Sequence, residues 1–545
     1  MLRSFLLLLL GPCLAFVKVV LATDAGDTID TGYAQYLGNR TFPNAVAYLG
    51  IPYAEPPLGE RRFRAPLPLN KTRIAVESNG EVVDATEYPD FCIQGSIGQG
   101  DAGGAGSEDC LNLNIYAPVG AKKGDNLPVL FYIHGGGYTN GNPRNWPFDH
   151  WIKQSPNVVV VSIYYRLASF GFLSIPEFDD SAVGDSNAGF LDQIEALRWV
   201  RDNIASFGGD PSKVTINGQS AGGGSVQHHL LANEENGLFS GAIAQSVARS
   251  KTPSPQQVKP LFDFYASRAG CDAATVDKKL TCLRSASVSA LAMAQDAART
   301  FNNSYNSFNP VVDGKVIVGH ATTLIRQGKF RRVPMMVGGT SNETSGSGDP
   351  AALLHARFPA LSDEDVQDII EAYPLEDFAS ADQRSRVLSG ENALICAREI
   401  FGEAWANAPS SWTYRYNQPN PTGDVTQGTT HAAENWMMFM GTNTGVNGTN
   451  EFTPMTPVET AFAEELIAYW LSFVRSGDPN TFKLARSPEW PRYTDEIPAS
   501  RRKRIVLQED PMNSTTRSGN FIEQQPENQA HRCAVVAGKS EGEQN

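Results

Sequence analysis

The sequence predicts an α/β fold, in which a large and mostly parallel sheet is flanked by helices and carries a helical cap or side lobe. Two observations lead to this prediction. Apolar runs typical of buried strands alternate with helical patterns, and the stretch 207–222 reads as a strand that turns sharply into a helix at a serine between glycines. Nothing marks a linker, a repeat or a low-complexity tract, so we expect residues 23–545 to form a single domain.

The predicted elements follow in chain order. Continuous apolar runs, the pattern of strands buried on both faces, occur at Leu127–Ile133 and Val158–Ile163. A helix follows, with apolar positions at Leu191, Ile194, Leu197, Trp199 and Val200, and after it the strand Val214–Ile216. Further strands are predicted at Ala242–Ala244, Val333–Val337 and Trp412–Tyr416. The segment from about Pro253 to Arg331 reads as helices and loops, and we expect it to form the cap or side lobe.

Residues 1–22 predict a secretory signal peptide. Arg3 precedes an apolar run, and small residues offer cleavage after Ala15 or Ala22. Lys18 interrupts the run, so a spanning helix of about 20 residues is not available here. No later segment predicts a membrane span, and the polar C-terminus resembles neither a lipid-anchor signal nor a retention tag. We therefore expect the mature chain to be secreted.

Cysteine usage agrees with export into an oxidising compartment. Removing Cys13 with the signal leaves six cysteines, an even set that suggests three disulfides. The sequence leaves the pairing open, but joining neighbours along the chain pairs Cys92 with Cys110 and Cys271 with Cys282, which leaves Cys396 with Cys533. Glycosylation sequons, consistent with an exported glycoprotein, begin at Asn39, Asn70, Asn302, Asn342, Asn447 and Asn513.

The charge of the chain excludes some classes of partner. It carries 45 Lys and Arg against 59 Asp and Glu, a formal net charge of −14 at pH 7. This charge repels nucleic-acid phosphates and anionic lipid surfaces, so nucleic acid is not an expected partner. The sequence contains neither C-x-x-C nor H-E-x-x-H, and its histidines lack metal-ligand spacing. We expect neither a metal nor a cofactor; the oligomeric state is left open.

The serine at the predicted turn is a candidate nucleophile. Ser220 lies in a G-x-S-x-G pentapeptide directly after a β-branched run and before several small residues, the pattern of a nucleophile elbow. Gly218 and Gly222 lack side chains where the strand and the helix crowd together. Donors for an oxyanion are expected from the loop His134–Tyr138, which follows a buried strand, and from the residue after Ser220. We assign them to the backbone amides of Gly136 and Gly137 in the loop and of Ala221.

A serine nucleophile needs a base and a group that orients the base. In this type of site the chain order is Ser, acid, His, which leaves as bases His320, His355, His431 and His531. We favour His431, on a loop that enters a helical pattern; His228 and His229 are interpreted as packing or surface residues. Glu343 follows the strand at 333–337 and is the predicted acid, with Asp349 as its rival. A buried Glu343 leaves little room beside it, so we expect no glycan on Asn342.

These residues resemble the type-B carboxylesterase and lipase family of the α/β-hydrolase fold, which includes cholinesterases and fungal lipases. Besides the elbow and HGGGY, the chain shows GIPYAEPPLGERRFRAP from Gly50, SEDCLNLNIYAP from Ser107 and NAGFLDQIEALRWVRDNIASFGGDP from Asn187, and the resemblance runs from about Tyr48 to Tyr493. It implies Ser220 as nucleophile, Glu343 as acid, His431 as base and the first two disulfides. The third disulfide resembles a bridge of cholinesterases. Departures from the family pattern are Asn112, Val247 and Thr344.

The loop between Cys92 and Cys110 bears on the kind of ester. It contains no aromatic residue and two isoleucines, so it cannot form the apolar helical lid of the resembling lipases. The tryptophan that binds a quaternary ammonium in cholinesterases has no counterpart here. We therefore expect a secreted serine esterase for soluble or moderately apolar esters, including aryl and cinnamoyl (feruloyl-type) esters. The alternatives are a lipase or sterol esterase, and a non-catalytic adhesion protein of the same fold.

Overall fold

The structure is a computed structural model that describes residues 27–96, 105–232, 237–344, 346–406, 410–444, 450–494 and 502–545. The predicted signal peptide and Asn447 lie outside the described residues. Among the described helices, none is both long and apolar enough to cross a membrane.

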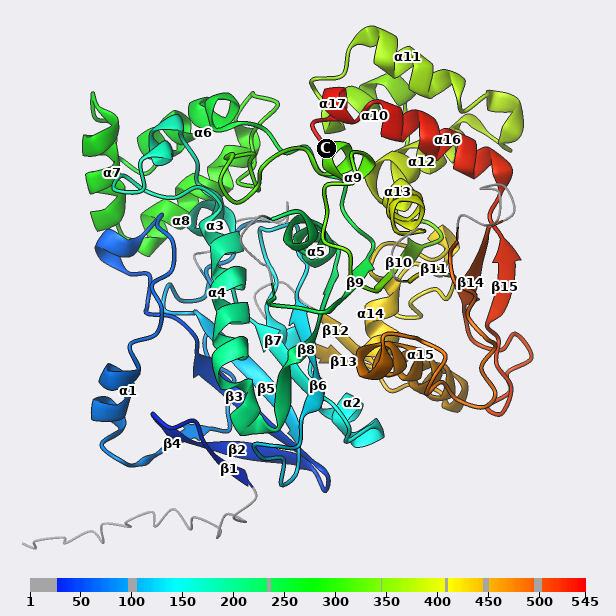
Figure 1. The fold of residues 1–545 in the computed structure, drawn as a ribbon. Coiled ribbons are helices and arrows are strands. Elements are labelled where there is room, and N and C mark those ends of the chain that lie inside the picture. The colour runs from blue at the N-terminus through cyan, green and yellow to red at the C-terminus, as the bar shows by residue number, and fades with distance from the viewer. Residues whose placement is uncertain are drawn as a thin grey trace, which may run out of the picture.

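One large sheet organises the described chain (Figure 1). Thirteen strands pair in this sheet. Twelve follow the order β1-β2-β3-β5-β7-β6-β8-β9-β10-β11-β14-β15, and β4 pairs with β2; β12 and β13 form a separate pair. The strands are β1 (Thr28–Asp30), β2 (Gln35–Phe42), β3 (Ala45–Pro52), β4 (Val82–Ala85), β5 (Asn112–Pro118), β6 (Leu127–Ile133), β7 (Val159–Ile163), β8 (Gly209–Gln219), β9 (Gly241–Gln245), β10 (Met335–Thr340), β11 (Ser411–Tyr416), β12 (Thr442–Thr444), β13 (Asn450–Phe452), β14 (Lys503–Leu507) and β15 (Phe521–Gln524).

The middle of the sheet is parallel. From β7 through β6, β8, β9, β10 and β11 to β14 every neighbouring pair runs in the same direction. Towards the edges β1, β2, β3 and β5 pair antiparallel, as do β5 with β7 and β14 with β15. Because parallel strands end at the same edge of a sheet, the loops after β6, β8, β9 and β10 meet there, which is where ligands of open α/β sheets bind.

Helices cover both faces of this sheet, as its apolar strands require. They are α1 (Lys71–Ser78), α2 (Asp149–Gln154), α3 (Ala168–Phe172), α4 (Ala188–Asn203), α5 (Ala221–Leu231), α6 (Pro255–Arg268), α7 (Val276–Ser285), α8 (Val288–Ala297), α9 (Ala321–Arg326), α10 (Pro350–Arg357), α11 (Asp363–Glu371), α12 (Ala381–Gly390), α13 (Cys396–Trp405), α14 (Ala433–Met438), α15 (Pro457–Ser476), α16 (Glu527–Gly538) and α17 (Ser540–Glu543).

Alternate residues of the strands face two separate cores. In β6, Phe131 packs in the core that contains residues of α4 and α5, whereas Leu130 packs in the core that contains residues of α2, α14 and α15. This alternation is the period of a strand, and because both faces are buried the sequence reads as a continuous apolar run. A smaller cluster lies in the lobe of α10, α11 and α12.

Most predicted elements are confirmed, with shifted ends. The strand at 127–133 has the predicted bounds, and those predicted at 242–244 and 412–416 are each slightly longer. The strand predicted at Val333–Val337 begins instead at Met335 and ends at Thr340. Pro334 directly precedes the strand: it has no N–H to donate to a neighbouring strand, although its carbonyl oxygen accepts from the Ala242 N–H at 3.0 Å. The segment 253–331 forms α6, α7, α8 and α9, and the first three gather in a lobe to one side of the sheet (Figure 1).

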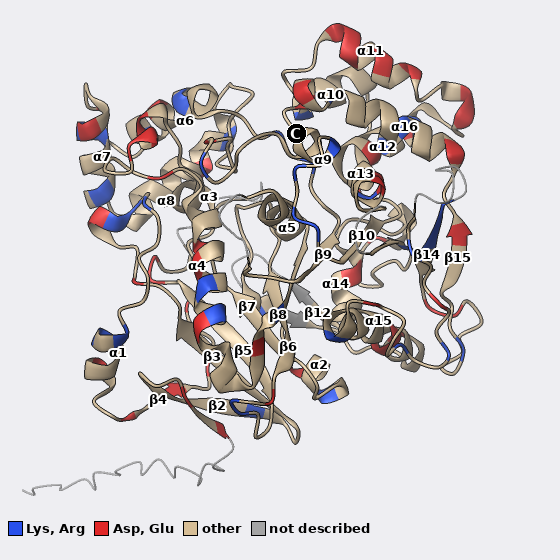
Figure 2. Cartoon of the chain, in the orientation of Figure 1, with Lys and Arg blue, Asp and Glu red and all other residues tan. Residues whose placement is uncertain are grey.

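Acidic residues are unevenly distributed over the helices (Figure 2). They concentrate on α11, which has three of them in its first turn, where they also complement the helix dipole. In contrast, α5, which follows Ser220, carries no Lys, Arg, Asp or Glu. The surroundings of the predicted nucleophile are therefore shaped mainly by backbone groups and neutral side chains.

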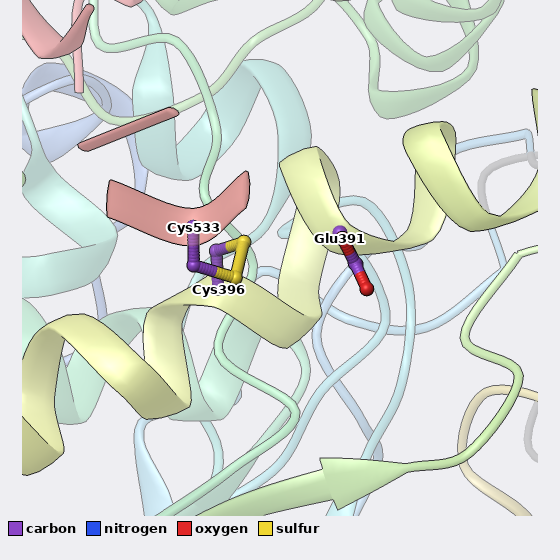
Figure 3. Close-up of side chains that lie close together, drawn as sticks. All are labelled: Glu391, Cys396 and Cys533. Atoms are coloured by element: carbon purple, nitrogen blue, oxygen red, sulfur yellow. A yellow bond between two sulfur atoms is a disulfide. The ribbon is translucent and has the colours of Figure 1, made fainter. Parts of the chain in front are cut away.

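The structure contains three disulfides, Cys92–Cys110, Cys271–Cys282 and Cys396–Cys533. The third joins α13 to the C-terminal helix α16 across 137 residues of sequence (Figure 3). Glu391 lies close to these two cysteines, but both sulfurs are bonded to each other and the Glu391 carboxylate is paired with Arg532 at 2.7 Å. This group therefore lacks the free thiolates that a metal site would need.

Candidate active site

The strand-to-helix turn at Ser220 is strained, as expected of a nucleophile elbow. Ser220 has φ 58° and ψ −120°, a conformation that non-glycine residues rarely adopt. It lies between β8 and α5, and its N–H donates to the carbonyl oxygen of Gln245 at 2.9 Å. The turn is possible because its neighbours lack side chains: a Cβ on Gly222 would lie 2.1 Å from the carbonyl oxygen of Ile133.

Ser220, His431 and Glu343 form one hydrogen-bonded line. His431 Nε2 lies 2.7 Å from Ser220 Oγ, and His431 Nδ1 lies 2.6 Å from Glu343 Oε2. The three residues come from the turn after β8, the loop before α14 and the loop after β10. The structure thus brings together the three side chains that the sequence singled out, in the order nucleophile, base and acid.

Glu343 is completely buried and held as a carboxylate. Burial by itself raises the pKa of a carboxyl group, but the hydrogen bond and the charge of His431 outweigh it, and the pKa of Glu343 is lowered. Its Oε1 also accepts hydrogen bonds from Ser246 Oγ and the Thr340 N–H, both at 2.7 Å. Ser246 follows β9, and sequence reasoning did not assign it to the site, because a single serine after a strand carries no distinguishing signal.

The candidate base, His431, remains accessible. The His431 side chain is 33% exposed, and its environment shifts its pKa in two directions. Burial lowers the pKa of the imidazole, but the hydrogen bond to Glu343 and the carboxylate charge raise it above its ordinary value. A base so placed can accept the proton of Ser220 and is stabilised by Glu343 once it is protonated.

The loop after β6 supplies backbone amides next to Ser220. Within the described residues no acceptor takes a hydrogen bond from the N–H of Gly136, Gly137 or Ala221. Gly136 has φ 111°, and a Cβ there would lie 2.0 Å from the carbonyl oxygen of Asn140, so this position requires glycine. Buried His134 stacks on Tyr165 with ring centroids 4.4 Å apart and fixes the start of the loop. Unpaired amides of this kind can stabilise an oxyanion.

The other sequence candidates for the acid and the base make different contacts. Asp349 caps α10 by accepting from the N–H of Ala352 at 2.8 Å. His355 lies on α10 and His531 on α16, and His320 pairs with Glu541 at 3.6 Å. His228 and His229 are buried on α5, where His229 Nε2 contacts Gln193 Oε1 at 3.1 Å, in agreement with a packing role.

A second buried carboxyl group lies next to His431 and was not recognised in the sequence. Glu434 is on α14, three residues after His431, and only 1% exposed. Neither carboxyl oxygen has a hydrogen-bond partner within the described residues. Burial and the charge of Glu343 raise the pKa of Glu434 to about 7. This carboxyl group therefore titrates near neutral pH, unlike Glu343.

Four of the predicted glycosylation sites, Asn39, Asn70, Asn302 and Asn513, are exposed, as glycosylation requires. Asn342 is exposed as well, although Glu343 beside it is buried. Crowding around Glu343 is therefore no reason to expect an unmodified Asn342. The absence of a glycan on Asn342 stays a prediction.

The chain is similar to known proteins over most of its length. A model of the carboxylesterase family matches residues 26–502. "Lipase 5" of Diutina rugosa is 33% identical over 507 residues, which covers 83% of this chain and 87% of the relative. "Acetylcholinesterase" of Bungarus fasciatus is 28% identical over 539 residues, 89% of this chain and 84% of the relative. The crystal structure of Aspergillus niger EstA has a TM-score of 0.81 and 29% identity, with 96% of this chain and 99% of that chain covered.

The central parallel sheet, the elbow after β8 and the structural match define an α/β-hydrolase. The chain belongs to the carboxylesterase family and is a carboxylic ester hydrolase. This finding confirms the resemblance seen in the sequence, and the alternative of a non-catalytic adhesion protein is not retained.

Proposed function

We propose that this protein is a secreted serine esterase that hydrolyses soluble or moderately apolar esters, including aryl and cinnamoyl esters, through an acyl-enzyme. The observation that supports the mechanism best is the line Ser220–His431–Glu343, with its contacts of 2.7 and 2.6 Å. Beside it lie three backbone amides that have no acceptor among the residues that the structure describes. A nucleophile, a base, an orienting acid and an oxyanion site are the parts that acyl transfer requires.

The reaction proceeds in two half-reactions on these groups. His431 Nε2 takes the proton of Ser220 while Oγ attacks the ester carbonyl, and the oxyanion accepts hydrogen bonds from Gly136, Gly137 and Ala221. Collapse of this intermediate breaks the bond to the alcohol, which leaves with the proton that His431 returns. Water then attacks the acyl-enzyme with His431 again as base, and the acid is released while Ser220 regains its proton. Each amide contributes about 3 kcal/mol to stabilisation of the transition state.

The composition of one segment favours soluble esters as substrates, rather than esters at an oil–water interface. The segment between Cys92 and Cys110 contains no aromatic residue and lacks the apolar face of an interfacial lid. The absence of a tryptophan from the same segment argues against choline esters. A lipase is the second candidate, favoured by identities of 33% and 32% to relatives named lipases.

Export is supported independently of the chemistry. The leader pattern of residues 1–22, three disulfides and the exposed sequons fit a glycosylated, secreted chain. The continuous sheet from β1 to β15 supports one domain over residues 23–545.

The proposal is tested with three esters: a short nitrophenyl ester, a methyl hydroxycinnamate and an emulsion of a long-chain triglyceride. We expect turnover of the first two, little on the emulsion, and loss of activity in Ser220→Ala. Activity on the emulsion alone would instead establish a lipase. Soluble-ester turnover that survives in Ser220→Ala would overturn the role of Ser220.

A further inference from the structure

A polar cavity of about 220 Å³ lies next to the loop that carries the oxyanion amides. It opens between the segment after Cys92, the end of α8 and the segment before Phe308. Its lining residues are Gly95, Ser96, Thr139, Ala168, Gln295, Asp296, Arg299, Asn306, Ser307 and Phe308.

The cavity and the candidate active site share a wall. The N–H of Thr139, which lines the cavity, donates to the carbonyl oxygen of Gly136 at 3.0 Å, and the Thr139 carbonyl accepts from Gly95 at 2.7 Å. Thr139 is two residues from Gly137, and two residues of chain span at most about 7 Å. A substrate whose carbonyl lies at Gly136 and Gly137 therefore extends a few bond lengths to reach the cavity.

The lining is suited to hydrogen bonds and poorly suited to an alkyl chain. Within the described lining, Phe308 is the one large apolar side chain. Buried Gln295 is already engaged: its Oε1 accepts from Ser169 Oγ at 2.7 Å, and its Nε2 donates to the Gln94 carbonyl at 3.0 Å. Gln295 thus holds neighbouring segments of the lining together. Thr139, Asn306 and Ser307 are further polar residues of the lining, and the Thr139 hydroxyl donates to the Gly137 carbonyl at 3.2 Å.

Arg299 places at the cavity a guanidinium group with unused N–H donors. Arg299 is exposed, and one of its guanidinium nitrogens donates to the carbonyl oxygen of Ser96 at 2.9 Å. A guanidinium has five N–H donors, so others remain available. Asp296 also lines the cavity, but its Oδ1 accepts from the N–H of Ser96 at 2.5 Å and holds that backbone in place. Asp296 keeps its negative charge, so what Arg299 adds at this wall is a set of N–H donors and a cation beside that carboxylate.

We propose that this cavity binds the polar end of the ester substrate, and that Arg299 makes it selective for esters that carry a carboxylate a few carbons from the ester bond. The inference rests on the proposed function of Ser220 and narrows its substrate class. A carboxylate matches the fork of a guanidinium, and charge-assisted hydrogen bonds are stronger than neutral ones. A terminal hydroxyl can use Asn306 and Ser307 but gains less from Arg299, and an alkyl terminus gains from neither.

The test compares matched esters on each side of the ester bond. On the acyl side these are methyl hexanoate, the methyl ester of hydroxyhexanoate with its hydroxyl on the terminal carbon, and monomethyl adipate. On the alcohol side they are hexyl acetate, the monoacetate of hexanediol and acetoxyhexanoate. We expect one of the two series to show kcat/KM rising from alkyl to hydroxyl to carboxylate, with the carboxylate ester about tenfold above the alkyl ester. The series that responds identifies the side that enters the cavity.

Arg299→Gln should remove the advantage of the carboxylate ester, with a smaller loss for the hydroxyl ester and the smallest for the alkyl ester, which gains nothing from Arg299. Arg201→Gln is the matched control, because Arg201 is an exposed arginine of α4 that pairs with Asp202 and does not line the cavity. The inference is overturned if the alkyl ester is preferred in both series, or if Arg299→Gln keeps the carboxylate preference. Failure of the proposed function gives a different result, because methyl hexanoate and hexyl acetate would then show no turnover that depends on Ser220.

Discussion

The hydroxyl of Ser246 donates a hydrogen bond of 2.7 Å to Oε1 of Glu343, while Oε2 of the same carboxylate holds His431 Nδ1 at 2.6 Å. The carboxylate is thus fixed from two sides, and its orientation does not depend on the histidine alone. Thr344, which departs from the family pattern directly after the acid, leaves this geometry intact, and its Oγ1 contacts the Arg386 carbonyl at 3.5 Å.

Ser246→Ala should lower kcat about tenfold without unfolding the protein. The change removes one hydrogen bond to a buried charge, which destabilises the carboxylate and weakens its hold on the protonated base. Steady-state kinetics over a range of pH checks this, because the loss of a charge-stabilising contact also shifts the acidic limb of the profile. Ser385→Ala is a suitable control, since Ser385 is a buried serine that donates to the Gly348 carbonyl, away from the candidate site. Equal kcat in the two variants would contradict a positioning role for Ser246.

Activity should fall on the acidic side of neutrality. His431 must be neutral to accept the proton of Ser220, so kcat/KM decreases as pH falls through the pKa of the imidazole in the free enzyme. Glu343 raises that pKa above its ordinary value of 6.5, so the midpoint of the acidic limb should lie above 6.5. A rate that stays flat between pH 4 and 8, a range of about four units around the ordinary pKa of histidine, would exclude His431 as the base.

Glu434 should make the folded protein less stable as pH rises. Its pKa is raised from 4.5 in the unfolded chain to about 7, so between these values the folded state holds a proton that the unfolded state releases. The free energy of unfolding therefore decreases with pH across this window, by on the order of 3 kcal/mol for this group. Glu434→Gln should remove this contribution, so that the variant matches the wild type near pH 4.5 and is more stable at about pH 8.

Urea unfolding of the wild type and the variant at both pH values measures this effect. The exposed Glu364 of α11 provides a control, because Glu364→Gln removes a carboxylate that is in contact with solvent in the folded protein. An unchanged difference between the two pH values in Glu434→Gln would show that Glu434 is ionised throughout.

Two of the disulfides should differ in their contribution to stability. Cys396–Cys533 closes a loop of 137 residues, whereas Cys271–Cys282 closes one of 11 residues. Chain entropy alone gives about 5 kcal/mol for the long loop and about 3 kcal/mol for the short one. Double Cys→Ser variants of each pair, compared by denaturant unfolding, should show the larger loss for the pair on α13 and α16. A larger loss from the short loop would mean that native contacts, such as Glu391–Arg532, outweigh loop entropy.

The sequence predicted the central sheet and the three aligned side chains because these features have local signals. Strands such as β6 are buried on both faces and read as uninterrupted apolar runs. Ser220 and Gly136 lie in motifs whose glycines are required by close approach of the backbone. Chain order then reduced the choice of base to a few histidines.

Other features depend on contacts between distant segments, which a single sequence does not display. Ser246 and Glu343 are 97 residues apart and meet only because β9 and β10 are neighbours. Glu434 looks in sequence like any acidic residue of an amphipathic helix, and its burial arises because α14 packs in the core on one face of the sheet. The antiparallel edges of the sheet were likewise not specified by the apolar runs at its centre.

The order of the central strands also bears on when activity first arises as the chain folds. Ser220 follows β8, Glu343 follows β10 and His431 precedes α14, so each side chain reaches its position only when its own part of the sheet has paired. A chain shorter than about 430 residues therefore has the candidate nucleophile but not the candidate base, and a folding intermediate without β10 lacks the candidate acid. Recovery of esterase turnover during refolding should consequently report completion of the central sheet, later than any signal from secondary structure alone.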